Sequence, residues 1–204
     1  MRRALAPARL PGTSDDRICF AGGETMMSWL DKILSRSSAS SDGVSSSDSE
    51  AIRRIVDGLE ALEPERASYV ASFAYILGRV AHADREISRV ETDAMERIVS
   101  RLGRLPEHQA ILAVQIAKSQ NRLFGGTENF LVTREFKQMA DEAQKRELLD
   151  CLFAVSAADD SISSVEEGQI RQIASELGLS HADYVQARLS YSDKRQVLEP
   201  FRRD

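Results

Sequence analysis

From about residue 50 to residue 190, apolar residues recur at helical spacing with few interruptions. No stretch of this region alternates apolar and polar residues between turn signals, as a half-buried strand would. A chain of this kind buries its apolar faces by packing helix against helix. The predicted fold class is therefore all-α, a compact bundle of about seven to eight helices joined by short loops.

Residues that start and stop helices divide this region. A first helix is predicted over 52–62, and a short one over 130–140. Gly103 and Gly178 follow apolar helical stretches, which is the usual place for a glycine that ends a helix. The Gly125-Gly126 pair separates two halves and is predicted to be the most mobile loop of the domain. Further helix starts are predicted at Pro64, Ser88, Pro106, Asp141, Ser163 and Ser180.

One short sequence motif occurs twice. Residues 82–92 read HADREISRVET, and residues 157–167 read AADDSISSVEE. The similarity continues into the following helix and predicts two related helix–loop–helix units, not an open solenoid. Packing about a pseudo-twofold axis would bring the equivalent loops near each other. The matched residues are Ala83, Asp84, Ile87, Ser88, Val90, Glu91, Ile98, Ser100, Leu102 and Gly103 with Ala158, Asp159, Ile162, Ser163, Val165, Glu166, Ile173, Ser175, Leu177 and Gly178.

The repeated text has a structural interpretation. Ser-x-x-Glu before an apolar run is the signature of a capping box, in which the serine and glutamate bond each other's backbone N–H groups. Ser88 with Glu91 and Ser163 with Glu166 both fit this pattern. The aspartate before each cap is typical of an Asx-turn. Helix capping alone is therefore enough to explain the motif.

The repeated text also has a functional interpretation. If the two turns face each other, the carboxylates of Asp84, Glu91, Asp159 and Glu166 converge. Ionised carboxylates crowd together at low cost only when a cation neutralises them or when some of them hold a proton. Oxygen ligands favour a hard divalent cation such as Ca²⁺ or Mg²⁺. The sequence thus offers a split metal site, to which His82, Asp160 and Glu167 lie close in the chain.

An EF-hand is excluded because the sequence lacks the ligands of the first half of its loop. Asp84, Ile87 and Glu91 match the second half of the EF-hand loop, but Val80 and His82 stand where two oxygen ligands belong. Apolar residues occupy the same places in the second copy, and the loop glycine is missing from both.

Composition and motifs exclude several functions. The formal net charge of −5 argues against nucleic-acid binding. The two cysteines form no zinc pattern, and Cys151 lies in an apolar helical stretch that predicts a core position. No catalytic motif occurs, and the three histidines are scattered. We therefore expect no enzymatic activity.

The first fifty residues differ from the rest. Residues 1–26 show no periodicity and are predicted to be a disordered or mis-annotated extension, with translation starting at Met26 or Met27. Residues 27–50 comprise a short amphipathic helix and a Ser-rich linker. Membrane contact is expected at most through residues 28–35, because two helical turns anchor weakly. No signal peptide or membrane span is visible, and the expected location is the cytoplasm.

The texts AHADREISRVE and SAADDSISSVEEGQIRQIASELGLS resemble the doubled A-x-A-D-G-x-I-S-x-x-E signature of the tellurite-resistance protein B (TerB-like) family, in particular its short bacterial branch. The resemblance covers roughly residues 65–192 and lies within an all-helical domain expected over 51–200. It implies a metal site built from Asp84, Glu91, Asp159 and Glu166. The chain departs from the signature at the family glycine, which is Arg85 in the first copy and Asp160 in the second.

Two hypotheses about function follow. The first is a non-catalytic cytoplasmic protein of the tellurite or stress-resistance type, with a divalent-cation site and protein partners. The alternative is a metal-free helical interaction module of the kind attached to co-chaperones. In both, the chain is a monomer or a weak dimer.

Overall fold

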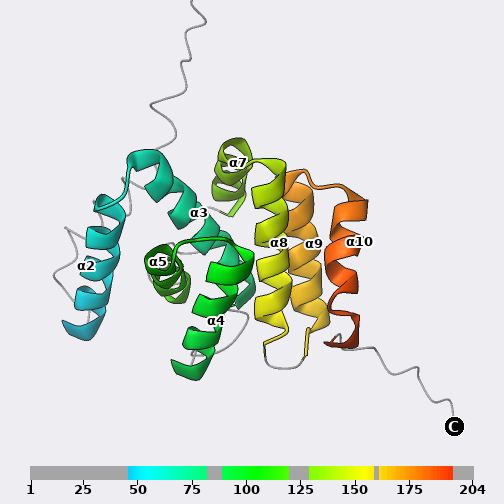
Figure 1. The fold of residues 1–204 in the computed structure, drawn as a ribbon, viewed down its shortest axis with the longest axis horizontal. Coiled ribbons are helices and arrows are strands. Elements are labelled where there is room, and N and C mark those ends of the chain that lie inside the picture. Colours follow the sequence, from blue (N-terminus) through cyan, green and yellow to red (C-terminus); the bar gives the residue numbers. More distant parts are fainter. Residues whose placement is uncertain (1–45, 82–88, 120–128, 159–160, 195–204) are drawn as a thin grey trace, which may run out of the picture.

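The computed structural model describes residues 46–81, 89–119, 129–158 and 161–194, and within them it contains eight α-helices and one short 3-10 helix (Figure 1). The predicted all-α class and helix number are confirmed. The Gly125-Gly126 loop and the first 45 residues lie outside the described part of the chain. The helices are α2 (Ser46–Glu60), α3 (Pro64–Ala81), α4 (Arg89–Leu102), α5 (Glu107–Lys118), α7 (Asn129–Met139), α8 (Glu142–Ser156), α9 (Ser164–Leu177) and α10 (His181–Leu189), followed by η1 (Ser192–Lys194).

Helix α3 is the centre of the bundle. It packs against α5, α7, α8 and α9, and nearly all its residues from Ala67 to Val80 are buried. Its sequence explains this position, because small and apolar residues occur on every side of the helix rather than along one stripe. Tyr69 and Phe73 from α3 meet Phe136 from α7, with ring centroids 5.2 and 6.2 Å apart.

The two halves of the repeat occupy comparable places. Helices α4 and α9 have 14 residues each, and their bounds coincide in the alignment of the two copies. The preceding helices α3 and α8 pack against each other, while α8 also contacts α4 and α3 also contacts α9. In Figure 1, α4 and α9 both begin at the lower end of the view. The first turns of α4 and α9 therefore lie at one end of the bundle.

Helix α2 forms the outer edge of the bundle, at the left of Figure 1, and packs on α5 and α3. Ile55 and Leu59, four residues apart, are its buried side chains. A Cβ at Gly58 would lie 3.0 Å from Leu112 of α5, so this contact depends on a small residue. No helix in the described part of the chain is both long and apolar enough to cross a membrane.

The helix ends differ between the two copies in an instructive way. Gly178 after α9 has φ +79°, as expected for a glycine that ends a helix. After α4 the positive φ falls on Arg104 (+49°) and not on Gly103. Gly103 is required for space instead, because an added Cβ would lie 2.7 Å from the Val99 carbonyl oxygen and 2.9 Å from Phe73 Cζ. The two equivalent glycines of the repeat are thus needed for different reasons, Gly178 for its positive φ and Gly103 for space.

Candidate functional site

The first turn of α9 carries the predicted capping box. Ser163, at φ −70° and ψ 158°, accepts a hydrogen bond through Oγ from the Glu166 backbone N–H at 3.2 Å. In return, Glu166 Oε2 accepts from the Ser163 backbone N–H at 2.8 Å and from Ser163 Oγ at 2.6 Å. These bonds satisfy N–H groups that a helix start leaves without intrahelical partners. The structural interpretation of the second copy is therefore correct.

The capping box uses one of the two carboxylate oxygens of Glu166. Its two hydrogen bonds from Ser163 both end on Oε2. Glu166 is partly exposed, and within the described residues no hydrogen bond ends on its Oε1. A carboxylate has about four acceptor positions on its two oxygens, which is more than the cap requires. Capping and cation binding by Glu166 are thus compatible.

The structure describes only part of the first half-site. Glu91 lies in the first turn of α4 and is exposed. Asp84 and Ser88 of the first copy and Asp159 of the second lie outside the described residues, as does His82. Of the four predicted ligands, the structure therefore places Glu91 and Glu166, both in first turns of helices that begin at one end of the bundle (Figure 1).

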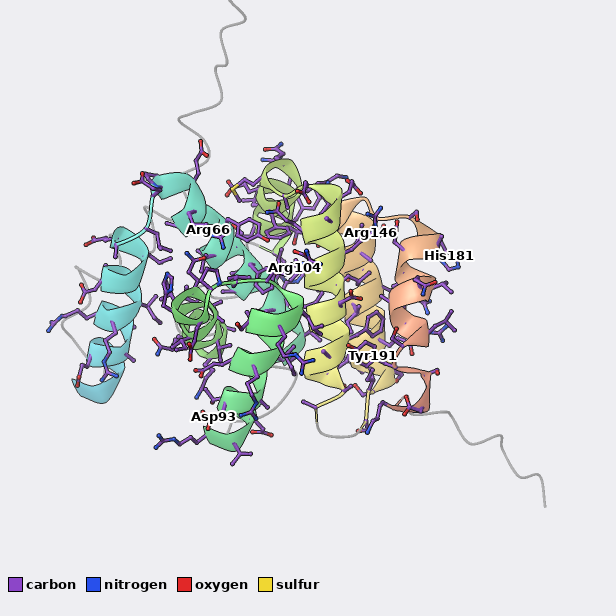
Figure 2. All side chains as sticks on the ribbon, viewed as in Figure 1. Arg66, Asp93, Arg104, Arg146, His181 and Tyr191 are labelled. Atoms are coloured by element: carbon purple, nitrogen blue, oxygen red, sulfur yellow. The ribbon has the colours of Figure 1, made fainter. Side chains whose placement is uncertain are left out.

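Charged side chains of both signs surround the first turn of α4. Asp93, at the lower end of α4 in Figure 2, is exposed. Burial raises the pKa of Glu96 above its ordinary value, and Asp93 adds to the increase while Lys118 opposes it. Lys118 also donates a hydrogen bond to Thr92 Oγ1 at 2.8 Å. A cation approaching the first turn of α4 would therefore meet the carboxylates of Glu91, Asp93 and Glu96, whose charge Arg89 and Lys118 offset.

Glu167 is not part of this site, which corrects the sequence-based expectation. Its side chain is buried and points to α10, where Oε1 lies 2.7 Å from Arg188 Nε and 3.3 Å from the Tyr184 hydroxyl. Arg171, one turn further along α9, is 3.6 Å from the same oxygen. The reason is helical geometry, because consecutive residues point about 100° apart around the axis. Glu166 and Glu167 are neighbours in the chain but lie on different sides of α9.

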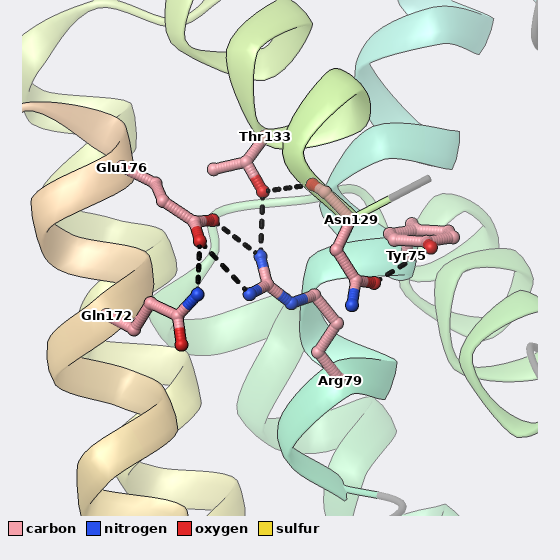
Figure 3. Close-up of polar contacts among 6 residues, drawn as sticks. All are labelled: Tyr75, Arg79, Asn129, Thr133, Gln172 and Glu176. Atoms are coloured by element: carbon pink, nitrogen blue, oxygen red, sulfur yellow. Dashed lines mark hydrogen bonds and ion pairs between the residues drawn. The ribbon is translucent and has the colours of Figure 1, made fainter. Parts of the chain in front are cut away.

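A buried polar junction was not predicted from the sequence. Arg79 of α3 donates to Glu176 of α9 at 2.7 and 3.4 Å, and both side chains are largely buried (Figure 3). Arg79 also donates to Thr133 Oγ1 at 2.8 Å, and Gln172 donates to Glu176 at 2.8 Å. Burial alone would raise the pKa of Glu176, but the hydrogen bonds from Arg79, Gln172 and Thr133 hold that pKa below its ordinary value. The junction joins α3, α7 and α9 and leaves its carboxylate already satisfied.

The described ranges, which leave out Asp84 and Asp159, contain no group of metal ligands. Within them, no three His, Cys, Asp or Glu side chains are placed to hold a metal ion. Cys151 is fully buried as predicted, and burial raises the pKa of its thiol well above the usual range. His108 and His181 are exposed on α5 and α10. The repeated turns therefore remain the candidate site.

Comparison with known proteins identifies a family. Neither a curated protein nor a solved structure matches the chain. The family model described as tellurite resistance protein TerB matches residues 70–189, from the middle of α3 to the end of α10. Since this range is more than half of the 204 residues, the chain belongs to the TerB family.

Proposed function

We propose that this TerB-family chain is a non-catalytic protein that binds a divalent cation through Asp84, Glu91, Asp159 and Glu166. The observation that carries the proposal is the one-sided use of Glu166, whose cap occupies Oε2 and leaves Oε1 for a further ligand. Glu91 lies in the first turn of the equivalent helix, α4, which begins at the same end of the bundle. The two aspartates belong to the turns that lead into these helices.

The donor set defines the cation class. A set of four carboxylates favours Ca²⁺ or Mg²⁺, which take oxygen ligands, over Zn²⁺ or copper. Carboxylates fixed at the start of a helix suit this task, because the capping bonds restrict their rotamers before a cation arrives. When bound, the cation would neutralise the acidic turns and hold the two helix starts together.

The same geometry supports a binding role rather than catalysis. Glu166 accepts backbone hydrogen bonds in the cap, so its charge stabilises the fold. The Cys151 thiol is buried and its raised pKa disfavours the thiolate that a nucleophile requires. His108 and His181 are exposed on separate helices and have no place in a triad.

The proposed biological setting follows from the family. We place the chain in the cytoplasm, in tellurite or stress resistance, where cation binding at the two turns would control the binding of protein partners. Resistance names a phenotype and not a mechanism. In this proposal, the molecular step that depends on the cation is the binding of protein partners.

Isothermal titration calorimetry of Ca²⁺, Mg²⁺, Mn²⁺ and Zn²⁺ into the full chain tests this proposal. We expect stoichiometric binding of a hard cation and its loss in the double variant Asp84→Asn with Asp159→Asn. Melting temperatures must rise with the bound cation, because a ligand that binds only the folded state stabilises it.

Asp183→Asn is the matched control. Asp183 forms the same capping box with Ser180 at the start of α10, but outside the repeated turns. This variant is expected to lose cap stability while keeping cation affinity. If none of the four cations binds the wild-type chain, the proposal fails.

The capping geometry itself favours the alternative, a metal-free helical interaction module. The box at Ser180 shows that this chain uses Ser-x-x-acid for capping where no repeat exists. On this interpretation the double variant changes only the free energy of unfolding, and divalent cations alter neither stability nor partner binding.

A further inference from the structure

Two residues without polar side chains, Val165 and Gly168, are exposed near the start of α9. Val165, in the first turn, is 63% exposed although it is apolar and β-branched. Gly168 follows three residues later on the same side of the helix and is also exposed. Val165 and Gly168 thus form a small patch without polar side chains, flanked by the exposed Ser164, Arg171 and Gln172.

Gly168 has no packing reason among its neighbours. A Cβ built on it meets no atom within 4 Å, whereas Gly103 and Gly178 are held by close contacts. A glycine inside a helix lowers its stability relative to alanine, so its presence needs another explanation. Close approach of a further chain segment to the helix backbone is one that physical chemistry provides.

The end of the described chain lies beside the start of α9. The Ile162 backbone N–H donates to the Lys194 carbonyl oxygen at 2.7 Å, and Ile162 directly precedes the α9 cap. Residues 195–204, which follow Lys194, read RQVLEPFRRD. Ten extended residues span about 33 Å, which exceeds the roughly 21 Å length of a 14-residue helix. The described chain therefore ends next to the start of α9, and the ten residues that follow are long enough to span this helix.

We propose that residues 195–204 pack along the outer face of α9, over Val165 and across Gly168. Val197, Leu198 and Phe201 supply the apolar side chains that the patch requires. The missing Cβ of Gly168 gives space for one of them to approach the helix backbone. This inference is independent of cation binding, and it assigns a role to a tail that lies beyond the residues matched by the family model.

Hydrogen exchange of the full chain, followed by mass spectrometry, tests the docking. The tail variant carries Val197→Ser, Leu198→Ser and Phe201→Ser, and the peptides of interest cover 163–172. Covering one exposed valine side chain corresponds to about tenfold in an equilibrium constant. We expect exchange in these peptides to become about tenfold faster in the tail variant.

Phe130→Ser is the matched control. Phe130 is 64% exposed, as Val165 is, but it lies on α7, where Thr133 neighbours Arg79 and Glu176 near the last turn of α9. Its exchange pattern over 163–172 is expected to equal that of the wild-type chain. Unchanged exchange there in the tail variant would overturn the proposal. Protection that rises with protein concentration would overturn it too, since the occupant would then be a second copy.

A second measurement does not depend on exchange. Gly168→Ala is expected to raise the melting temperature more in the tail variant than in the wild-type chain. In the tail variant alanine improves the helix at no cost, whereas in the wild-type chain its methyl group displaces the tail. Equal increases in both backgrounds would show that nothing packs across Gly168.

Discussion

Glu176→Gln is the sharpest probe of what holds the two halves of the bundle together. The Arg79 and Glu176 side chains are only 9% and 15% exposed, and their closest atoms are 2.7 Å apart. Glutamine keeps the shape of the side chain but removes its charge. Arg79 would then remain inside the bundle without its counter-ion, while its bond to Thr133 Oγ1 persists.

The expected loss follows from burial rather than from distance. Removing one partner of a buried ion pair typically costs about 3–5 kcal/mol, because the other charge stays desolvated. Partial exposure of Glu176 and the surviving bond to Thr133 place this variant near the lower end, at about 3 kcal/mol. For a chain of this size that is a decrease of about 6–12 °C in melting temperature. Arg79→Met with Glu176→Leu should recover most of the loss.

Urea unfolding monitored by circular dichroism measures these differences. Glu50→Gln in α2 is the control, since Arg54 and Glu50 are also 2.7 Å apart but are 64% and 66% exposed. An exposed i,i+4 pair is worth about 0.3–0.5 kcal/mol. If Glu176→Gln costs no more than Glu50→Gln, the reasoning from burial is wrong.

The pH dependence provides an independent check on the same pair. The pKa of Glu176 is lower in the folded chain than its ordinary value of 4.5, so its contribution is complete above that value. The contribution is lost as pH falls through the lowered folded pKa. The stability gap between wild type and Glu176→Gln must therefore narrow below about pH 4.5.

Three further predictions concern other features. Arg104→Gly should stabilise the chain by about 0.5 kcal/mol, because relief of the positive φ outweighs the exposed ion pair with Glu147; urea midpoints check this, and a variant no more stable than the wild-type chain would contradict it. Gly103→Ala should cost about 2 kcal/mol in the same assay, because the new methyl group meets Phe73, and a neutral result would show that the ring moves aside. Cys151 should resist iodoacetamide at pH 8 until urea unfolds the chain, since burial raises its pKa; peptide-resolved mass spectrometry that finds it alkylated in the folded chain would refute this.

Local signals explain why most helix boundaries could be predicted. Pro64 begins α3, and Asp141, Ser163 and Ser180 cap α8, α9 and α10 as expected. Each signal acts within about four residues, because a cap satisfies backbone groups of the turn next to it. The residues that cap a helix can therefore be recognised in the sequence even when the packing of that helix is unknown.

The junction of Arg79 and Glu176 shows what such signals leave out. The two residues are 97 positions apart, and each interrupts an apolar helical stretch with nothing nearby to indicate its partner. Only the packing of α3 against α9 brings them together. Glu167 illustrates the converse, since its place beside Glu166 in the chain suggested a shared site, while the helix turns the two side chains apart.

The sequence predicts the residue types of the candidate site but not how their side chains are arranged. The Ser163–Glu166 cap follows from the motif, and the structure contains it. That the cap uses one oxygen of Glu166 depends on a rotamer, which the motif does not specify. Asp84 and Asp159 lie outside the described residues, so the four-carboxylate site stays a prediction.

The all-round burial of α3 has a consequence for how the chain tolerates mutation. A helix with one buried stripe accepts substitutions with a period of 3.6 residues, because its solvent face is permissive. Helix α4, in which Met95 and Val99 are the fully buried side chains, should show that rhythm in a saturation mutagenesis screen. From Ala67 to Val80 α3 has almost no permissive face. Its tolerance profile should be uniformly low, so that a periodicity analysis of the screen alone would fail to recognise the central element of the bundle as a helix.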